Sequence, residues 1–234
     1  MKRLIRSLLG AVLPMLALAD SAAAASCGTM AAPTACSLTS GNVVFTASAF
    51  QLLVSSFTTQ YQVSDILIEI LAAGSGNAQL QFSKNPNGPT PGIVFLANPG
   101  ESAAFSHSYQ MDIAPAQPGT VALTGLNGNG TFSAAGNGVS SVQFIVDGMP
   151  SSCLATSGNG GSANCALPPG GATSFQAGDI VQLGGNTGNT SIVSYRNVYN
   201  TSFTAASSAV PEPGSFAMLG LGIGILAWRR MERK

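Results

Sequence analysis

His107 is the only histidine in the sequence, so it is the first candidate for acid–base chemistry near neutral pH. A hydrolase would place it beside a nucleophilic serine and an orienting carboxylate such as Asp112. Ser106 and Ser108 flank His107 in the chain, but in a strand they point to the opposite face. We therefore interpret His107 as a core histidine with one hydrogen-bond partner, and we predict no catalytic residue and no enzyme activity.

Carboxylates offer two other kinds of chemistry. Asp65 and Glu69 are four residues apart. Residues at this spacing lie on one face of a helix and also on one face of a strand, so the spacing does not establish a glycosidase pair. Asp147 and Asp179 lie in segments predicted to be turns, where calcium could bind, but no Asp-x-Asp-x-Asp-Gly run is present. The sequence predicts no metal site and no cofactor.

Two tyrosines late in the chain could serve recognition. If exposed on a sheet, Tyr195 and Tyr199 could stack on sugars, with Arg196 and nearby asparagines supplying hydrogen bonds. The same spacing also fits ordinary core positions of a strand. We favour the core interpretation.

Alternation of apolar and polar residues is the clearest structural signal. Between Ala103 and Ile113 every second residue is apolar or aromatic, apart from His107, and the residues between are mostly Ser, Gln or Asp. This pattern predicts a long half-buried strand. Further strands are expected at 42–50, 65–71, 79–82, 121–123, 142–147, 181–183 and 193–199. Residues 48–57 could instead form a short helix.

Frequent turn signals separate these runs. They occur at 85–89, 98–100, 127–130, 137–138, 147–148 and 177–179, and most contain Asn-Gly or Asp-Gly pairs or a proline. Many short strands with frequent turns predict an all-β fold. We expect an antiparallel β-sandwich, with a jelly roll as the alternative.

Charge is scarce and unevenly placed. Charged residues make up 8% of the chain, against about 25% in typical soluble domains. Between Cys27 and Ala209 the only basic residues are Lys84 and Arg196, against six acidic residues, which gives a net charge of −4. Such a body does not attract a phosphate backbone, so we exclude nucleic acid as a partner.

The N-terminus is organised like a secretory signal peptide. Its parts, in order, are the basic residues Lys2, Arg3 and Arg6, the apolar run Leu8–Ala19 and the small residues Ala22–Ser26. The apolar run is too short for a stable bilayer span. Cleavage after Ala19 or after Ala25 fits the small residues at those positions. We predict that residues 1–25 form a signal helix that is removed after transit through the Sec translocon.

The C-terminus also has three parts. A Pro-Glu-Pro motif, Pro211, Glu212 and Pro213, follows Val210 and precedes the apolar run Phe216–Trp228. Arg229, Arg230 and further basic residues come after that run. The apolar run has 13 residues, fewer than the about 17 to 25 of a stable span. The basic end is expected to stay cytoplasmic. Residues 207–234 are thus predicted to be a linker and a hydrophobic sorting helix that enters the inner membrane only transiently.

The tail from Val210 to Lys234 resembles the PEP-CTERM sorting signal, because motif, apolar stretch and arginine pair occur in that order. The resemblance implies recognition by an exosortase, a membrane-embedded cysteine protease. It also implies cleavage near the Pro-Glu-Pro motif and delivery of the body to the cell surface or extracellular matrix of a Gram-negative bacterium. Many proteins with this signal are linked to exopolysaccharide and biofilm formation.

The four cysteines suit an oxidising compartment. Cys27 and Cys36 are close in sequence, and Cys153 and Cys165 enclose a Gly-rich stretch. An even count in an exported chain favours two local disulfides, 27–36 and 153–165, although four cysteines allow three pairings. Neither pair has the spacing of zinc ligands.

These observations predict a single body, residues 26–206, between two removable ends. We expect a non-enzymatic surface or matrix protein with a structural or adhesive role and with extracellular polysaccharide as a partner. The alternatives are a carbohydrate-binding module and, with less support, a secreted hydrolase.

Overall fold

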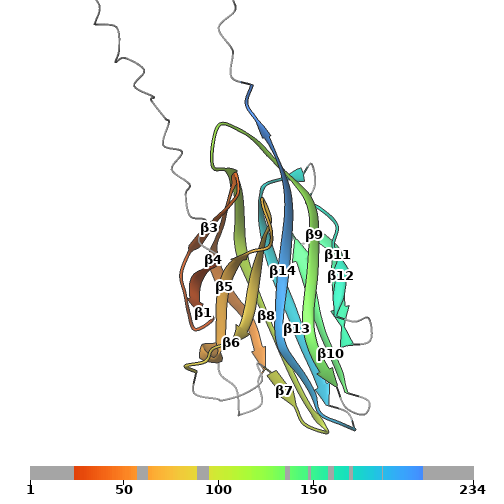
Figure 1. Ribbon diagram of the computed structural model, residues 1–234. Helices are drawn as coiled ribbons and strands as arrows, with labels where there is room; N and C mark the ends of the chain where they lie inside the picture. The colour runs from red at the N-terminus through yellow and green to blue at the C-terminus, as the bar shows by residue number, and fades with distance from the viewer. Residues whose placement is uncertain are drawn as a thin grey trace, which may run out of the picture.

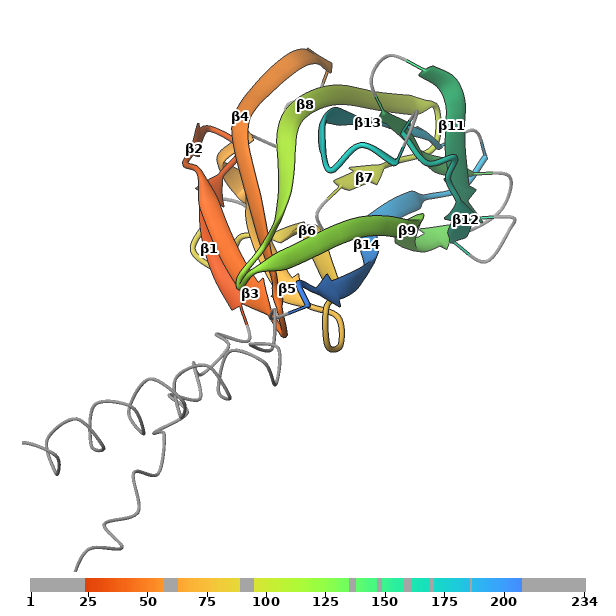
Figure 2. The ribbon, with the colours of Figure 1, turned by 90° about the horizontal axis from the view of Figure 1, so that it is seen from above.

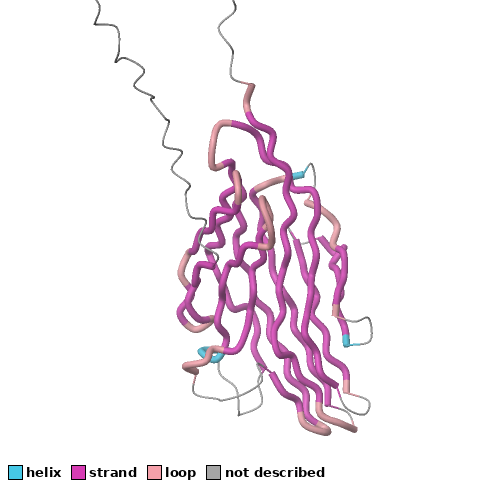
Figure 3. The backbone as a smooth tube through the Cα atoms, viewed as in Figure 1, coloured by secondary structure: helices cyan, strands magenta, loops and turns pink. Residues whose placement is uncertain are grey.

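The computed structural model describes residues 24–56, 63–88, 95–134, 138–146, 149–157, 161–168, 171–185 and 187–207. Within these ranges almost all regular structure is strand, as the tube in Figure 3 shows, and the one named helical element is the 3₁₀ turn η1 (Val63–Asp65). The all-β prediction is therefore confirmed. The predicted signal and sorting helices lie outside the described residues.

Six strands form one antiparallel sheet (Figure 1). Its order is β11 (Met149–Thr156), β10 (Val139–Val146), β13 (Ser174–Gly185), β8 (Glu101–Pro115), β4 (Val43–Ser56) and β3 (Cys36–Ser40). The strand predicted from alternation over 103–113 is the middle of β8, and its apolar face, including His107, is buried.

Eight strands form the second sheet, whose described pairings are also antiparallel. Its order is β12 (Ser162–Asn164), β9 (Gly119–Ala134), β14 (Thr190–Ala205), β6 (Ala78–Lys84), β5 (Ile66–Ala72), β1 (Ala24–Thr29) and β2 (Ala32–Pro33), and β7 (Phe95–Ala97) pairs with the start of β14. In the view from above, the two sheets face each other across a shared interior (Figure 2).

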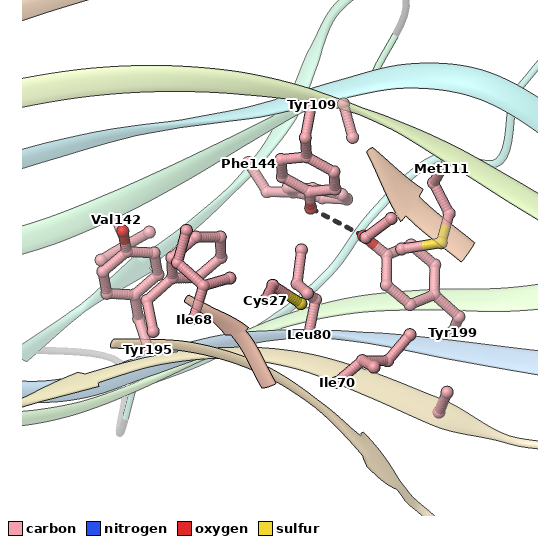
Figure 4. Packing of buried hydrophobic residues seen from close by; sticks show 14 of the residues in the cluster. Cys27, Ile68, Ile70, Leu80, Tyr109, Met111, Val142, Phe144, Tyr195 and Tyr199 are labelled. Carbon is pink, nitrogen blue, oxygen red and sulfur yellow. Dashed lines mark hydrogen bonds between the residues drawn. The ribbon is translucent and has the colours of Figure 1, made fainter. Parts of the chain in front are cut away.

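The shared interior is built from the inward side chains of both sheets (Figure 4). The largest fully buried side chains are Tyr109, Tyr195, Tyr199, Phe45, Phe82, Phe105 and Phe144. Burying an aromatic side chain of this size contributes roughly 2 to 3 kcal/mol. The interior is thus large enough to hold the two sheets together.

Both disulfides join the two sheets at their lateral edges. Cys27 of β1 pairs with Cys36 of β3, and Cys153 of β11 pairs with Cys165, which follows β12. The predicted pairings are present. Each loop closure is worth about 3 kcal/mol in the chain-entropy model. One link lies beside β1 and β3 and the other beside β11 and β12, so each open side of the two-sheet body carries a covalent tie.

Two predicted turns are wrong, because glycines there serve close packing inside strands. Residues 127–130 lie within β9, where a Cβ on Gly128 would lie 3.3 Å from the Cys153 sulfur. Residues 177–179 lie within β13, where a Cβ on Gly178 would lie 2.6 Å from the His107 carbonyl oxygen. The turns at Asn85–Gly88 and Asn98–Gly100 are confirmed, whereas Asn137 and residues 147–148 lie outside the described residues.

The alternative of a short helix at 48–57 is wrong for residues 48–56, which belong to β4. The pairing of β4 with β8 shifts register twice, between Ser48 and Gln51 and between Leu52 and Val54. Ala49 adopts a left-handed backbone with φ of 51°. These bulges break the strict alternation, so the apolar residues here resemble a helical pattern.

The described chain enters and leaves the body at the same end. Ala24 pairs with Leu71 near the turn that joins β5 to β6, and the Thr201 amide donates to the Asn77 side chain of that turn. Figures 1 and 2 both show β14 ending on the side where β1 begins. We call this end the entry pole.

Candidate functional site

Six polar or titratable side chains meet inside the body and form what we call the inner cluster. They are His107 and Tyr109 from β8, Asp179 from β13, and Tyr195, Asn197 and Tyr199 from β14. All six residues are at most 1% exposed. The cluster therefore spans the interior from the six-stranded to the eight-stranded sheet.

Asn197 is the hub of the inner cluster. Its Nδ2 donates to both carboxyl oxygens of Asp179, at 3.1 and 2.9 Å, and to the Tyr109 hydroxyl at 2.8 Å. The Tyr109 hydroxyl in turn bonds the Tyr199 hydroxyl at 2.7 Å, the dashed line in Figure 4. These bonds fix the register of β14 against β8 and β13, because polar groups buried without a partner cost free energy.

His107 extends the inner cluster toward Tyr195. Its Nε2 lies 2.9 Å from the Tyr195 hydroxyl and 3.4 Å from an Asp179 carboxyl oxygen. The ring of Phe82 lies 4.4 Å from the imidazole, centroid to centroid. Within the described parts of the chain, Nδ1 has no hydrogen-bond partner. His107 is thus a core histidine, as predicted, but its carboxylate neighbour is Asp179 rather than Asp112.

Burial controls the protonation of this pair. Removal from water lowers the pKa of His107 to about 3 and raises the pKa of Asp179 to about 8, the latter opposed by the hydrogen bonds from Asn197. At neutral pH the imidazole and the carboxyl group together therefore hold one proton and no net charge. Desolvation also raises the pKa of Tyr109, Tyr195 and Tyr199, so the three hydroxyls stay protonated.

Among the described residues, no serine hydroxyl bonds the His107 imidazole. Its side chain is fully buried, and Ser106 and Ser108 lie on the opposite face of β8. Asp112 also points away from the interior and accepts hydrogen bonds from Ser174 at 2.6 Å and from Gln110 at 3.3 Å. The arrangement stabilises the fold and holds a proton.

The carboxylates considered for a glycosidase pair are separated. Asp65, the last residue of η1, is buried and accepts a 2.8 Å hydrogen bond from Lys84, whereas Glu69 lies on the outward face of β5. In the part of the chain that the structure describes, no three His, Cys, Asp or Glu side chains gather as metal ligands would.

The outward face of the eight-stranded sheet carries a second polar group of residues. Cross-strand pairing aligns Ser26, Glu69, Gln81, Arg196, Asn129 and Ser162 in one row across β1, β5, β6, β14, β9 and β12. Arg196 is exposed, whereas Tyr195 and Tyr199 are buried, which confirms the core interpretation of the tyrosines. A hollow of about 210 Å³ lies beside Arg196.

Sequence reasoning considered Asp179 only as a possible calcium ligand and did not single out Asn197. The inward position of each could be detected from the two-residue repeat of a strand. Asp179 shares a face of β13 with Ala177 and Val181. Asn197 shares a face of β14 with Tyr195 and Tyr199. The turn signal at 177–179 concealed the first pattern. The pattern on β14 does not reveal the partner of Asn197, because Asp179 comes beside Asn197 only in the folded protein.

The predicted processing residues lie outside the described residues. They are Val210, Pro211, Glu212, Pro213, Arg229 and Arg230. Within the described ranges, no helix has the length and apolar character needed to cross a membrane.

Comparison with known protein families identifies the tail as a protein-sorting signal. Residues 209–234 match the family model of the PEP-CTERM protein-sorting motif. The chain is therefore an exported protein that an exosortase sorts through the membrane to the cell surface. No curated protein and no solved structure matches the chain.

Proposed function

We propose that the protein is a non-enzymatic component of the cell surface or extracellular matrix, with a structural or adhesive role linked to exopolysaccharide and biofilm. The observation that carries the proposal is the sorting motif at 209–234. A body that an exosortase releases outside the cell acts among extracellular polymers.

The architecture of the body supports a structural role. Two sheets facing each other across one interior support the description of the body as a β-sandwich, and disulfides tie both lateral edges. Covalent ties of this kind suit a protein that persists in an oxidising environment. Charged side chains are few and the outward strand faces are mostly Ser, Thr, Asn and Gln, which suits contact with hydrated polymers.

The route that we propose has three stages. The signal peptide within residues 1–25 directs the chain through the Sec translocon, and the apolar run Phe216–Trp228 holds the precursor in the inner membrane of a Gram-negative cell. An exosortase then cuts near Pro211–Pro213, and the body proceeds to the cell surface or the matrix. The short apolar run and the basic end after it support this transient stop.

A carbohydrate-binding module is the second candidate function. The polar row that includes Gln81, Arg196 and Asn129 favours it, because this row offers amide, hydroxyl and guanidinium groups on one face. For the secreted hydrolase the support is weaker, since the only histidine is fully buried.

Replacing Pro211, Glu212 and Pro213 together by alanine tests the route. We expect the unchanged chain outside the cell without Trp228, and the variant in the inner membrane with Trp228 still attached, as mass spectrometry of each fraction would show. A matched control replaces Ser207 by Ala, just before the tail. Recovery of the unchanged protein from the cytoplasmic membrane with Trp228 in place would overturn the proposal.

A further inference from the structure

Among the described residues, Arg196 is a cation without an anionic partner. Of the two basic residues between Cys27 and Ala209, Lys84 is already paired with the buried Asp65 at 2.8 Å, and Arg196 has no ion pair among the described residues. Glu69 lies in the same row, but Gln81 of β6 separates it from Arg196. In the structure the Arg196 and Glu69 side chains form no ion pair with each other.

The surroundings of Arg196 are neutral hydrogen-bonding groups. The hollow of about 210 Å³ is lined by Arg196 and Ser194 of β14, Asn129 and Thr131 of β9, and Ser162 of β12. Register places Asn129 directly between Arg196 and Ser162, and Thr131 directly beside Ser194. One guanidinium is thus surrounded by one amide and three hydroxyls.

This combination matches one class of ligand. A guanidinium binds a carboxylate or a sulfate ester through two parallel hydrogen bonds, and amide and hydroxyl groups suit the ring hydroxyls of a sugar. Among the described residues that line the hollow, Tyr195 is the one aromatic residue, and it turns its ring to the interior, so the hollow offers no stacking surface. The charge on the ligand therefore decides binding here.

We propose that the hollow beside Arg196 binds an acidic sugar residue of an extracellular polysaccharide. The guanidinium holds the acidic group, and Asn129, Thr131, Ser162 and Ser194 hold the neighbouring hydroxyls. This inference rests on the proposed function in one respect, namely that the body reaches extracellular polysaccharide. The body's net charge of −4 gives no general attraction for polyanions, so recognition depends on this local site.

The test uses the processed protein recovered from the outside of producing cells, titrated with polygalacturonate, dextran sulfate and uncharged dextran. We expect binding to at least one acidic polymer and none to dextran. The preferred polymer then identifies the acidic group as a carboxylate or a sulfate ester. Arg196→Gln should weaken that binding about tenfold, and Arg196→Lys should weaken it less, because a lysine keeps the charge but loses the paired hydrogen bonds.

The control Gln182→Ala alters an exposed side chain on the other sheet and should bind like the unchanged protein. Equal binding by Arg196→Gln, binding to dextran as tight as to the acidic polymers, or no binding to either acidic polymer would each overturn the inference. The amount of unchanged protein outside the cells tests the proposed function separately. A protein that reaches the surface but ignores both acidic polymers refutes the site and leaves the route intact.

Discussion

The two faces of β14 carry polar residues under opposite conditions. On the inward face, Tyr195, Asn197 and Tyr199 are at most 1% exposed, and each bonds a side chain of the opposite sheet. On the outward face, Ser194 and Arg196 border a hollow that opens to solvent. Consecutive residues of one strand thus serve the fold and the surface in turn.

The difference shows where a polar substitution matters for stability. A buried polar group must keep its partner, because removing one member of a buried pair leaves the other without a hydrogen bond. An exposed polar group exchanges its partner for water at little cost. The loss of stability in variants along β14 should therefore depend on which face the residue lies on rather than on its type.

The largest effect is expected from Asn197→Ala. The change leaves both Asp179 oxygens and the Tyr109 hydroxyl without the amide donor, so the free energy of unfolding should fall by about 3 kcal/mol. Urea unfolding at pH 5 measures the loss. Ser194→Ala, on the outward face of the same strand, is the control and should cost less than about 0.5 kcal/mol. A loss below about 1 kcal/mol for Asn197→Ala would contradict the role of the hub.

The pH dependence of stability should be flat between about pH 3.8 and 6.5, the ordinary pKa values of Asp and His. In that window the folded and the unfolded states each hold one proton on His107 and Asp179 together. Above it the unfolded chain holds none, while the folded protein keeps the Asp179 proton up to about pH 8. The free energy of unfolding should therefore fall by about 2 kcal/mol from pH 6.5 to 8.

Below pH 3.8 the unfolded chain binds a second proton, which the folded protein accepts only near the His107 pKa of about 3, so stability falls again by about 1 kcal/mol. Urea unfolding from pH 3 to 8 traces both limbs. Asp179→Asn removes the carboxyl group, so the alkaline limb should disappear and the acid limb should begin near pH 6.5. An alkaline limb that persists in this variant would assign it to other groups.

Tyr199→Phe should give a smaller loss of about 1 kcal/mol. It removes the 2.7 Å bond to the Tyr109 hydroxyl but keeps the ring, which packs beside Phe175, and Tyr109 retains the bond from Asn197. Urea unfolding at pH 5 measures it, with Ser202→Ala at an exposed position of the same strand as a comparison. No change in stability would show that the Tyr109–Tyr199 bond adds nothing to the fold.

The smallest effect on stability is expected from Arg196→Gln. An exposed side chain without an ion pair among the described residues should change the free energy of unfolding by less than about 0.5 kcal/mol. Thermal unfolding of the variants used in the polysaccharide titrations measures it. A larger loss would mean that Arg196 supports the sheet, and the two faces of β14 would no longer differ as described.

Sequence alone predicts what depends on neighbouring residues. Strand β8 alternates without interruption, so its buried face, His107 included, is readable from the sequence. The disulfides join cysteines only 9 and 12 residues apart, which favours their pairing without knowledge of the fold. The sorting tail is a contiguous motif and is recognised by the same kind of local reading.

Features that depend on distant residues could not be predicted in the same way. Asp179 and Asn197 are 18 residues apart, and His107 and Tyr195 are 88 apart, so no local pattern pairs them. Glycine is also ambiguous, because Gly128 and Gly178 make room for a disulfide and for a neighbouring backbone rather than for a turn. The outward row that contains Arg196 depends on the register of six strands, and that register exists only in the folded sheet.

The entry pole brings the two ends of the described body together. The described chain begins there at Ala24, and β14 passes the same pole at Thr201, which contacts the turn that contains Asn77. A tether at either end therefore holds the molecule by the same tip. On the route proposed above, cleavage near the Pro-Glu-Pro motif therefore frees the body at the same tip from which its first described strand starts.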